Sequence, residues 1–182
     1  AEIPVACDCE SVPVIRRNSE IYREKYGEDV PVKMHPLIRS REACFLSSSY
    51  AVKLAKEYNT RIHILHLSTA DEMKLFSNEL PLAQKRITGE VCVHHLWFDE
   101  TAYADKGTLV KWNPAIKTRF DREALLNSTI NDVIDIVATD HAPHTIEEKH
   151  NSYFKAPSGG PLVQHSLVAM LELWHRKLIS SE

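Results

Sequence analysis

Hydrophobic residues in this chain gather in short continuous runs, separated by longer polar stretches. A strand that is buried on both faces of a parallel sheet reads as such a run, without in-out alternation. The runs predict strands at 3–10, 61–69, 86–98 and 133–144, with 109–117 as a further short strand. Because helix-favouring stretches alternate with them, the pattern predicts an α/β fold built on a parallel sheet.

The intervening stretches predict helices, which we place at residues 17–29, 40–59, 70–80, 121–131 and 165–179. Ser40 is a plausible N-cap for the second of these, since its hydroxyl can accept a hydrogen bond from the first turn. One apolar stripe in this helix has helical spacing and consists of Ala43, Leu46, Tyr50, Leu54 and Tyr58. We expect this stripe to face the core.

Polar residues that can hold a metal or a proton fall at the ends of the predicted strands. Asp8, His66 and Asp140 each close one run, and the pair His94–His95 closes another. In a (β/α)8 barrel the chemistry lies at the carboxyl ends of the strands, so this placement favours a barrel over an open sheet. Four strands cannot close an eight-stranded barrel. We therefore expect a partial (β/α)8 TIM-type barrel, roughly the last four strand-helix units, as a single incomplete domain over 1–182.

Composition excludes several classes of protein. With 43% hydrophobic and 26% charged residues, the chain of 182 residues has the balance of an ordinary globular protein. A net charge of -3 argues against nucleic-acid binding, and no apolar run approaches the ~20 residues of a membrane span. Four scattered cysteines predict reduced thiols and a cytoplasmic location. The chain opens on Ala1 without a signal peptide, which indicates a piece of a longer polypeptide.

Four segments together resemble the dihydroorotases of the cyclic amidohydrolase superfamily. They read HILHLST, KWNPAIK, VATDHAPHTIEEK and APSGGPLVQHSL, and the resemblance extends over essentially the whole chain. It implies the second half of a catalytic barrel that holds one or two zinc ions. It also implies a hydrolase that opens the ring amide of dihydroorotate reversibly, giving N-carbamoyl-aspartate in pyrimidine biosynthesis. A protein-bound metal suits this reaction because it activates water and polarises the carbonyl.

The resemblance also implies roles for individual residues. Asp140 matches the aspartate that contacts the metal and acts as the acid/base, and His66 matches a metal-binding histidine. His144 matches the histidine that holds the substrate carboxylate, and Asn113 matches an asparagine that contacts dihydroorotate. The backbone near Pro157 and Gly159 matches the loop that meets the ring amide. His63 is expected to be structural, while of His94 and His95 one borders the site and the other packs.

The chain departs from the family pattern in two ways. The opening HxH motif and the bridging lysine or aspartate are missing, so we expect zinc to bind weakly or not at all to this chain alone. Asp8 stands where the family has a histidine ligand. It can still bind metal through oxygen, with a shift towards harder ions. The open strand edges would need cover from the missing N-terminal half or from a second copy.

Two other functions compete with dihydroorotase. Dihydropyrimidinase, hydantoinase and allantoinase share the metal chemistry, although His144 and Asn113 better suit a substrate that carries a carboxylate. Alternatively, the chain is a catalytically inactive dihydroorotase-like subunit that scaffolds a partner such as aspartate transcarbamoylase. Asp8 and the missing HxH motif favour this alternative, whereas the intact Asp140 and His66 favour an enzyme acting on a small molecule.

Overall fold

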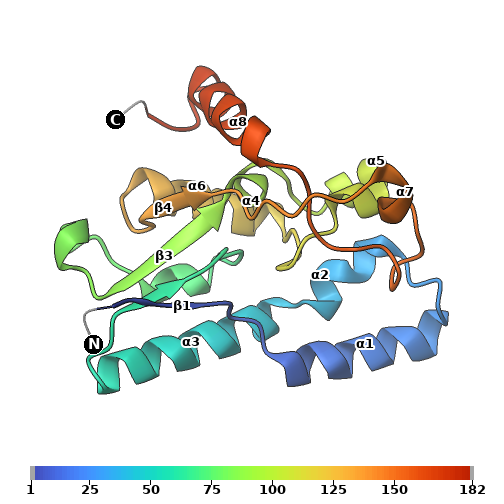
Figure 1. Ribbon diagram of the computed structural model, residues 1–182, viewed down its shortest axis with the longest axis horizontal. Coiled ribbons are helices and arrows are strands. Elements are labelled where there is room, and N and C mark those ends of the chain that lie inside the picture. Colours follow the sequence, from blue (N-terminus) through green and yellow to red (C-terminus); the bar gives the residue numbers. More distant parts are fainter. Residues whose placement is uncertain (1–2, 181–182) are drawn as a thin grey trace.

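Four short parallel strands form the centre of the computed structural model, which describes residues 3–180 (Figure 1). The outermost residues of the predicted domain, 1–2 and 181–182, lie outside the described part. The strands are β1 (Val5–Cys7), β2 (Ile62–Ile64), β3 (Ile87–Cys92) and β4 (Ile136–Ala138). They pair in the consecutive order β1-β2-β3-β4, all parallel. This order is that of successive strands in a (β/α) barrel, and the four main strand predictions are confirmed.

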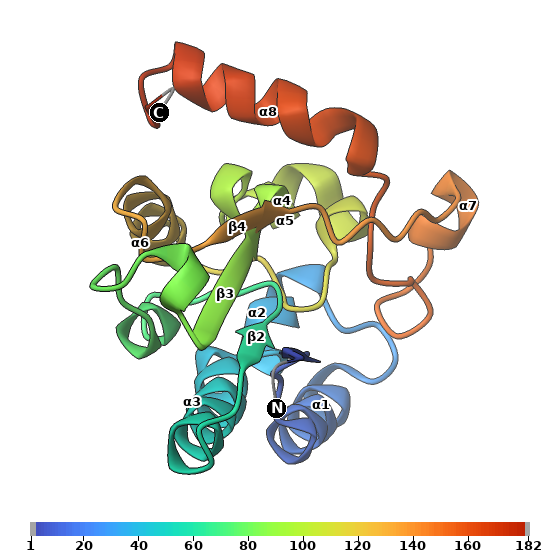
Figure 2. The same ribbon diagram turned by 60° about the vertical axis from the view of Figure 1, so that its left-hand side comes forward.

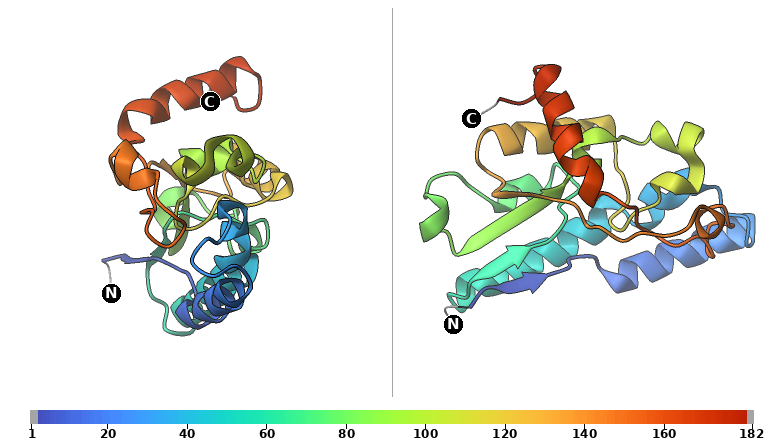
Figure 3. Two further views of the ribbon diagram at one scale, coloured as in Figure 1. Left: turned by 90° about the vertical axis from the view of Figure 1, so that its right-hand side faces the viewer. Right: turned by 45° about the horizontal axis from the view of Figure 1, so that its top comes forward.

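Helices connect and flank the strands, with bounds α1 (Val12–Tyr26), α2 (His35–Ile38), α3 (Arg41–Glu57), α4 (Val93–Trp97), α5 (Ala102–Lys106), α6 (Arg119–Ile130), α7 (Ile146–Lys149) and α8 (Val163–His175). Helices α1 and α3 lie on the side of β1, whereas α8 lies at the opposite side of the molecule, beyond β4 and next to α4 (Figures 1 and 2). Figure 3 shows α8 at one side of the molecule, and its Leu173 is buried in the core. No helix in residues 3–180 is long and apolar enough to cross a membrane.

Helix α3 begins as predicted but packs through a different face. The hydroxyl of Ser40 accepts a hydrogen bond from the backbone N–H of Ala43, which confirms the N-cap. The predicted stripe is wrong, because Leu46, Tyr50 and Tyr58 are each more than half exposed. The buried positions are Ala43, Cys44, Ser48, Val52 and Ala55. Small residues on this face let the helix approach the strands closely, which a search for large apolar residues overlooks.

Two further predictions of secondary structure are wrong. The helix expected at 70–80 is reduced to one 3-10 turn, Glu72–Leu75, because the Glu72 carboxylate accepts hydrogen bonds from the backbone of Ser68 and Thr69 and holds a tight turn there. The strand expected at 109–117 is absent. A 3-10 turn occupies Gly107–Val110, and a cis peptide bond joins Asn113 to Pro114, which has no N–H to donate to a ladder.

His94 and His95 were expected at the end of a strand, but they do not lie on one. The strand β3 ends at Cys92, and both histidines lie in the helix α4 that follows directly. The end of β3 thus turns sharply, and this turn buries both imidazoles, which are 1% and 2% exposed.

The core lies between the inner strands and the helices, and the outer strands remain open. Ile62 and Ile64 of β2 and Val91 of β3 are buried, together with Leu96 and Leu125. On the outer strands, by contrast, Val5 is 49% exposed and Ile136 is 45% exposed. Apolar side chains of β1 and β4 therefore face solvent, as expected for a sheet that lacks neighbours on both edges.

Candidate active site

The three predicted metal-binding residues lie just beyond the carboxyl ends of three strands. Asp8 follows β1 directly, and His66 and Asp140 each come two residues after β2 and β4. The backbones of His66 and Asp140 have φ angles of 37° and 45°, in the left-handed region. Non-glycine residues seldom adopt this conformation, and it tends to occur at functional sites. The same sharp turn therefore ends both strands and presents both side chains.

Asp8 and His66 approach each other across the neighbouring strands. Nε2 of His66 lies 3.7 Å from a carboxylate oxygen of Asp8. The His66 side chain is 9% exposed, whereas the Asp8 side chain is 67% exposed, so the pair lies at the rim of the sheet. The other ring nitrogen of His66, Nδ1, is buried and has no hydrogen-bond partner in the described structure.

Asp140 is held in a setting that favours its protonated form. Partial burial raises the pKa of its carboxyl group above the ordinary value, and the negative charges of Asp8 and Glu90 raise it further. The charge of His66 acts in the opposite direction but does not cancel these effects. A carboxylate whose pKa is raised holds a proton more firmly, which suits a group that accepts a proton and later returns it.

Glu90 links His66 to a second histidine beneath it. The backbone N–H of His66 donates a hydrogen bond of 3.4 Å to Glu90, and Nε2 of His63 lies 3.1 Å from the other carboxylate oxygen. Nδ1 of His63 contacts the Thr88 hydroxyl at 2.9 Å. Burial raises the pKa of Glu90, but these hydrogen bonds lower it more, so the group stays charged. The sequence alone does not indicate this role of Glu90, because its partners come from a different strand.

Asn113 has free capacity for a ligand, whereas both ring nitrogens of His144 have protein partners. The Oδ1 atom of Asn113 is buried and has no hydrogen-bond partner in residues 3–180. An unpaired buried acceptor of this kind is unfavourable unless a ligand or water donates to it. Nε2 of His144 lies 3.2 Å from the backbone oxygen of Ser158, and Nδ1 lies 3.5 Å from Glu148. His144 is therefore tied to the loop that carries Pro157 and Gly159.

The loop around Gly159 packs closely against the protein's own backbone. Gly159 has a φ of 129°, and a Cβ atom there would lie 2.6 Å from the carbonyl oxygen of Ala142. Its N–H donates a 3.0 Å hydrogen bond to the carbonyl of Lys111. Glycine is therefore required here by close packing against the segment that follows β4, on which His144 also lies.

Lys149 fixes this loop, which sequence reasoning missed. Its ammonium group donates hydrogen bonds to the carbonyls of Lys111, Pro157 and Gly159 at 3.1, 3.0 and 2.9 Å. Burial lowers the pKa of Lys149 to about 8. The only available signal in the sequence was a lysine at the end of a short helix, which normally reads as a solvated charge.

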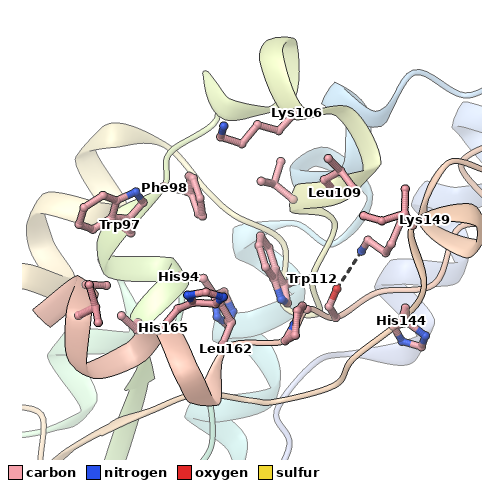
Figure 4. A pocket seen from close by; sticks show the side chains of 18 of the residues that line it. His94, Trp97, Phe98, Lys106, Leu109, Trp112, His144, Lys149, Leu162 and His165 are labelled. Atoms are coloured by element: carbon pink, nitrogen blue, oxygen red, sulfur yellow. Dashed lines mark hydrogen bonds between the residues drawn. The ribbon is translucent and has the colours of Figure 1, made fainter.

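A cavity of about 610 Å³ opens beside the loop, between α4, α7 and α8 (Figure 4). His144 and Gly159 line it, together with Trp112 and Lys149. Asp8, His66 and Asp140 do not. The structure thus brings His144 and Gly159 together at one cavity, which neither Asn113 nor Pro157 lines, and places the predicted metal residues at the strand ends.

A different group of donors is the most compact in the described part of the chain. The thiol of Cys92 and the rings of His94 and His95 offer ligand atoms that all lie within 4.8 Å of one another. Asp8, His66 and Asp140 are more widely spaced than this. Burial lowers the pKa of His95 to about 3 and that of His94 well below the ordinary value, so both rings are neutral.

The set of Asp8, His66 and Asp140 nevertheless fits a zinc ion in kind. One imidazole and two carboxylates are ordinary zinc donors, and three protein ligands leave a position open for water or substrate. Nδ1 of His66 is buried without a hydrogen-bond partner, and Nε2 lies 3.7 Å from the Asp8 carboxylate, which is too long for a strong hydrogen bond. Neither ring nitrogen therefore has a strong partner among the described residues. The site accordingly has donor capacity that the described residues do not use.

Comparison with known proteins finds similarity to part of longer proteins. Over 144 residues the chain is 36% identical to the dihydroorotase of Halobacterium salinarum. The aligned region covers 79% of this chain and 33% of that relative. Over 181 residues it is 28% identical to the dihydroorotase of Methanosphaera stadtmanae. This alignment covers 98% of this chain and 41% of the relative. The chain is similar to part of a dihydroorotase. It spans less than half of the length of these relatives, and no protein-family model matches it.

Solved structures show the same fold. The dihydropyrimidinase of Brevibacillus agri superposes with a TM-score of 0.84 at 22% identity, over 97% of this chain and 40% of that chain. The dihydroorotase of Saccharomyces cerevisiae, solved with 5-fluoroorotic acid, gives 0.67 at 17% identity, over 75% of this chain and 38% of that chain. These identities are too low to indicate more than the fold. The prediction of an α/β fold that forms part of a barrel is thereby confirmed.

Proposed function

We propose that this chain forms the second half of the catalytic barrel of a dihydroorotase. The proposed enzyme is a cytoplasmic, zinc-dependent hydrolase of pyrimidine biosynthesis that interconverts dihydroorotate and N-carbamoyl-aspartate. The observation that carries the proposal is the placement of His66, Asp8 and Asp140 at three strand ends, with His66 3.7 Å from Asp8 and with His66 and Asp140 on matching left-handed turns. The similarity in sequence to dihydroorotases supports the choice of substrate.

The chain's own residues would divide the reaction between them. His66, Asp8 and Asp140 would hold zinc, which when bound activates water and polarises the ring carbonyl. Asp140 accepts the proton of the attacking water and delivers it to the ring nitrogen as the amide bond breaks. The oxygen of the water ends in a new carboxylate, and the nitrogen ends in a ureido group. The raised pKa of Asp140 suits both halves of this transfer.

Asn113 and His144 would orient the substrate. The free Oδ1 of Asn113 can accept a hydrogen bond from a ring N–H, and His144 can hold the carboxylate. Lys149 fixes the carbonyls of Pro157 and Gly159 in the loop that faces the ring amide. The remaining metal ligands and the cover for β1 and β4 would come from the rest of the barrel, supplied by another segment or by a second copy.

The assay is hydrolysis of dihydroorotate by the complete polypeptide that carries this chain, with dihydrouracil and hydantoin as competing substrates. We expect turnover of dihydroorotate to exceed that of the two analogues, because only dihydroorotate has a carboxylate for His144. Preferred turnover of dihydrouracil or hydantoin would assign the chain to a dihydropyrimidinase or hydantoinase instead.

An inactive scaffold is the second candidate, and Asp8 is the observation that favours it. Aspartate stands where a histidine ligand is expected, and it is two-thirds exposed. A complete polypeptide that binds zinc fully but hydrolyses none of the three cyclic amides would support the role of an inactive scaffold. A zinc-dependent turnover that is lost in His66→Ala would exclude it.

A further inference from the structure

Cys92, His94 and His95 form a compact and fully buried group at the end of β3. Their exposed fractions are 0%, 1% and 2%, and their donor atoms all lie within 4.8 Å of one another. The proposed hydrolysis uses none of the three residues. A thiol and two imidazoles are the donors that zinc and the softer transition metals prefer.

The ring nitrogens of this group lack partners. Nδ1 and Nε2 of His94 and Nδ1 of His95 are buried without a hydrogen bond in residues 3–180. Leaving buried polar atoms unpaired is unfavourable, and three such atoms at one place call for a bound group. These nitrogens lie beside the thiol of Cys92. The atoms without hydrogen-bond partners are therefore atoms that can bind a metal.

The second nitrogen of His95 is already arranged as in a metal site. Nε2 lies 3.0 Å from the carbonyl oxygen of Pro114, and at this distance the N–H donates to the carbonyl. This fixes the tautomer, so Nδ1 carries a lone pair rather than a proton. Histidine ligands of metals commonly donate their other N–H to a backbone carbonyl in this way.

Packing holds the rings, and a small movement would complete the site. The His94 ring stacks on Trp112 (Figure 4), with centroids 4.6 Å apart and planes 15° from parallel. The centroid of His94 lies 4.2 Å from that of His95. Around zinc the donor atoms stand about 3.5 Å apart, given bonds of about 2.0 to 2.3 Å. Closing the present spacing needs a shift of about 1 Å, which rotation of the Cys92 side chain can supply in part.

An entry path leads to the group from solvent. His94 lines the cavity of about 610 Å³ that Figure 4 shows, next to Trp112 and Leu162. A hydrated ion can therefore reach one ligand before it exchanges water for the other two. Entry from this side does not pass the strand ends where His66 and Asp140 lie, since those residues do not line the cavity.

We propose that Cys92, His94 and His95 form a second metal site, which binds a borderline-soft divalent ion such as Zn²⁺ through one thiolate and two imidazoles. The site of Asp8, His66 and Asp140 has mostly oxygen donors and favours harder ions, so the two sites differ in donor softness. This inference concerns binding alone and does not depend on which cyclic amide, if any, the protein hydrolyses.

The test is titration of the purified protein with Co²⁺, which gives a sulfur-to-metal charge-transfer absorption only when a thiolate is bound. We expect the band to appear in the wild type and saturate at one thiolate-bound ion per chain. It should be lost in Cys92→Ser and retained in Cys9→Ser, a buried thiol next to Asp8. His94→Gln and His95→Gln should each weaken the ion's affinity at least tenfold. A wild type without the band, or a band that persists in Cys92→Ser, would overturn the proposal.

A measurement on the wild type alone covers the case in which Cys92→Ser does not fold. X-ray absorption of the protein loaded with two equivalents of Zn²⁺ should show sulfur scattering at about 2.3 Å, corresponding to one sulfur for every two zinc ions. Zinc coordinated only by nitrogen and oxygen would refute the site. Loss of dihydroorotate hydrolysis would leave either result unchanged, so this test and that of the proposed function fail separately.

Discussion

Nε2 of His66 lies 3.7 Å from the carboxylate of Asp8, although the two residues belong to different strands. The parallel pairing of β1 with β2, in which Cys7 lies opposite Ile64, brings the two strand ends to the same edge of the sheet. Asp140 reaches this edge from β4, and the charges of His66 and Asp8 both act on its carboxyl group. Three groups suited to a metal thus lie at the same edge of the sheet, where the strands end.

Replacement of Asp140 by Asn should abolish most of the activity and leave the fold intact. A positioned acid/base contributes about 10²- to 10⁴-fold, so we expect kcat for dihydroorotate hydrolysis to fall at least 100-fold. Asparagine tolerates the left-handed backbone at this position, and the melting temperature should stay within a few degrees. Asp132→Asn is the matched control, since Asp132 is an exposed aspartate with a φ of 55°. Turnover within tenfold of wild type would remove Asp140 from the acid/base role.

Exchange of Asp8 for His should tighten zinc binding. Imidazole nitrogen is a stronger zinc donor than a single exposed carboxylate oxygen, and the position faces Nε2 of His66. We expect the zinc dissociation constant, measured by competition with a chelator, to fall by about tenfold. Asp29→His, at an exposed aspartate after α1, should leave the constant unchanged. Equal affinities in Asp8→His and the wild type would place Asp8 outside the metal's ligands.

Lys149→Met should loosen the loop without changing the chemical step. It removes the donor to the carbonyls of Lys111, Pro157 and Gly159, so the loop loses its fixed position. The expected result is a rise in KM of about tenfold with kcat within threefold, and faster hydrogen exchange at the amide of Gly159. Lys106→Met, an exposed lysine at the same cavity, is the control. Unaltered exchange at Gly159 would show that Lys149 does not hold the loop.

The stability of the protein should depend on pH through His35. Burial lowers the pKa of His35 well below its ordinary value of 6.5, so the folded protein keeps this ring neutral. Below pH 6.5 the unfolded chain takes up a proton that the folded chain does not, and stability therefore falls as pH falls. One such proton corresponds to about 1.4 kcal/mol per pH unit.

The variant for this test is His35→Gln, because glutamine can still donate to the carbonyl of Trp112, which now lies 2.6 Å from Nε2 of His35. The unfolding free energy should be measured by chemical unfolding between pH 6.5 and pH 5. Its slope against pH should be smaller in the variant by the contribution of about one proton, about 1.4 kcal/mol per pH unit. Parallel curves for the two proteins would show that His35 titrates normally in the folded state.

The positions of the strands and of the polar residues at their ends could be predicted from the sequence, because both depend on local patterns. A continuous apolar run followed by His66 or Asp140 is visible without any knowledge of the fold. Parallel order then places the ends together, since carboxyl ends of parallel strands share one edge.

Features that depend on contacts between distant segments could not be predicted. Glu90 matters because it accepts from His63 and His66 on the neighbouring strand, and Lys149 matters because it reaches three carbonyls of two other segments. The burial of His94 and His95 follows from the turn after Cys92, which the apolar letters of 86–98 do not indicate. The small-residue face of α3 likewise depends on how closely the sheet lies.

The most direct measurement of the central claim is the rate of zinc-dependent dihydroorotate hydrolysis in the complete polypeptide, compared between wild type and His66→Ala. If His66 and Asp140 share a metal at the strand ends, the wild type turns over dihydroorotate and the variant loses both bound zinc and at least 100-fold of the rate. Full activity in His66→Ala, with an unchanged zinc content, would contradict the account.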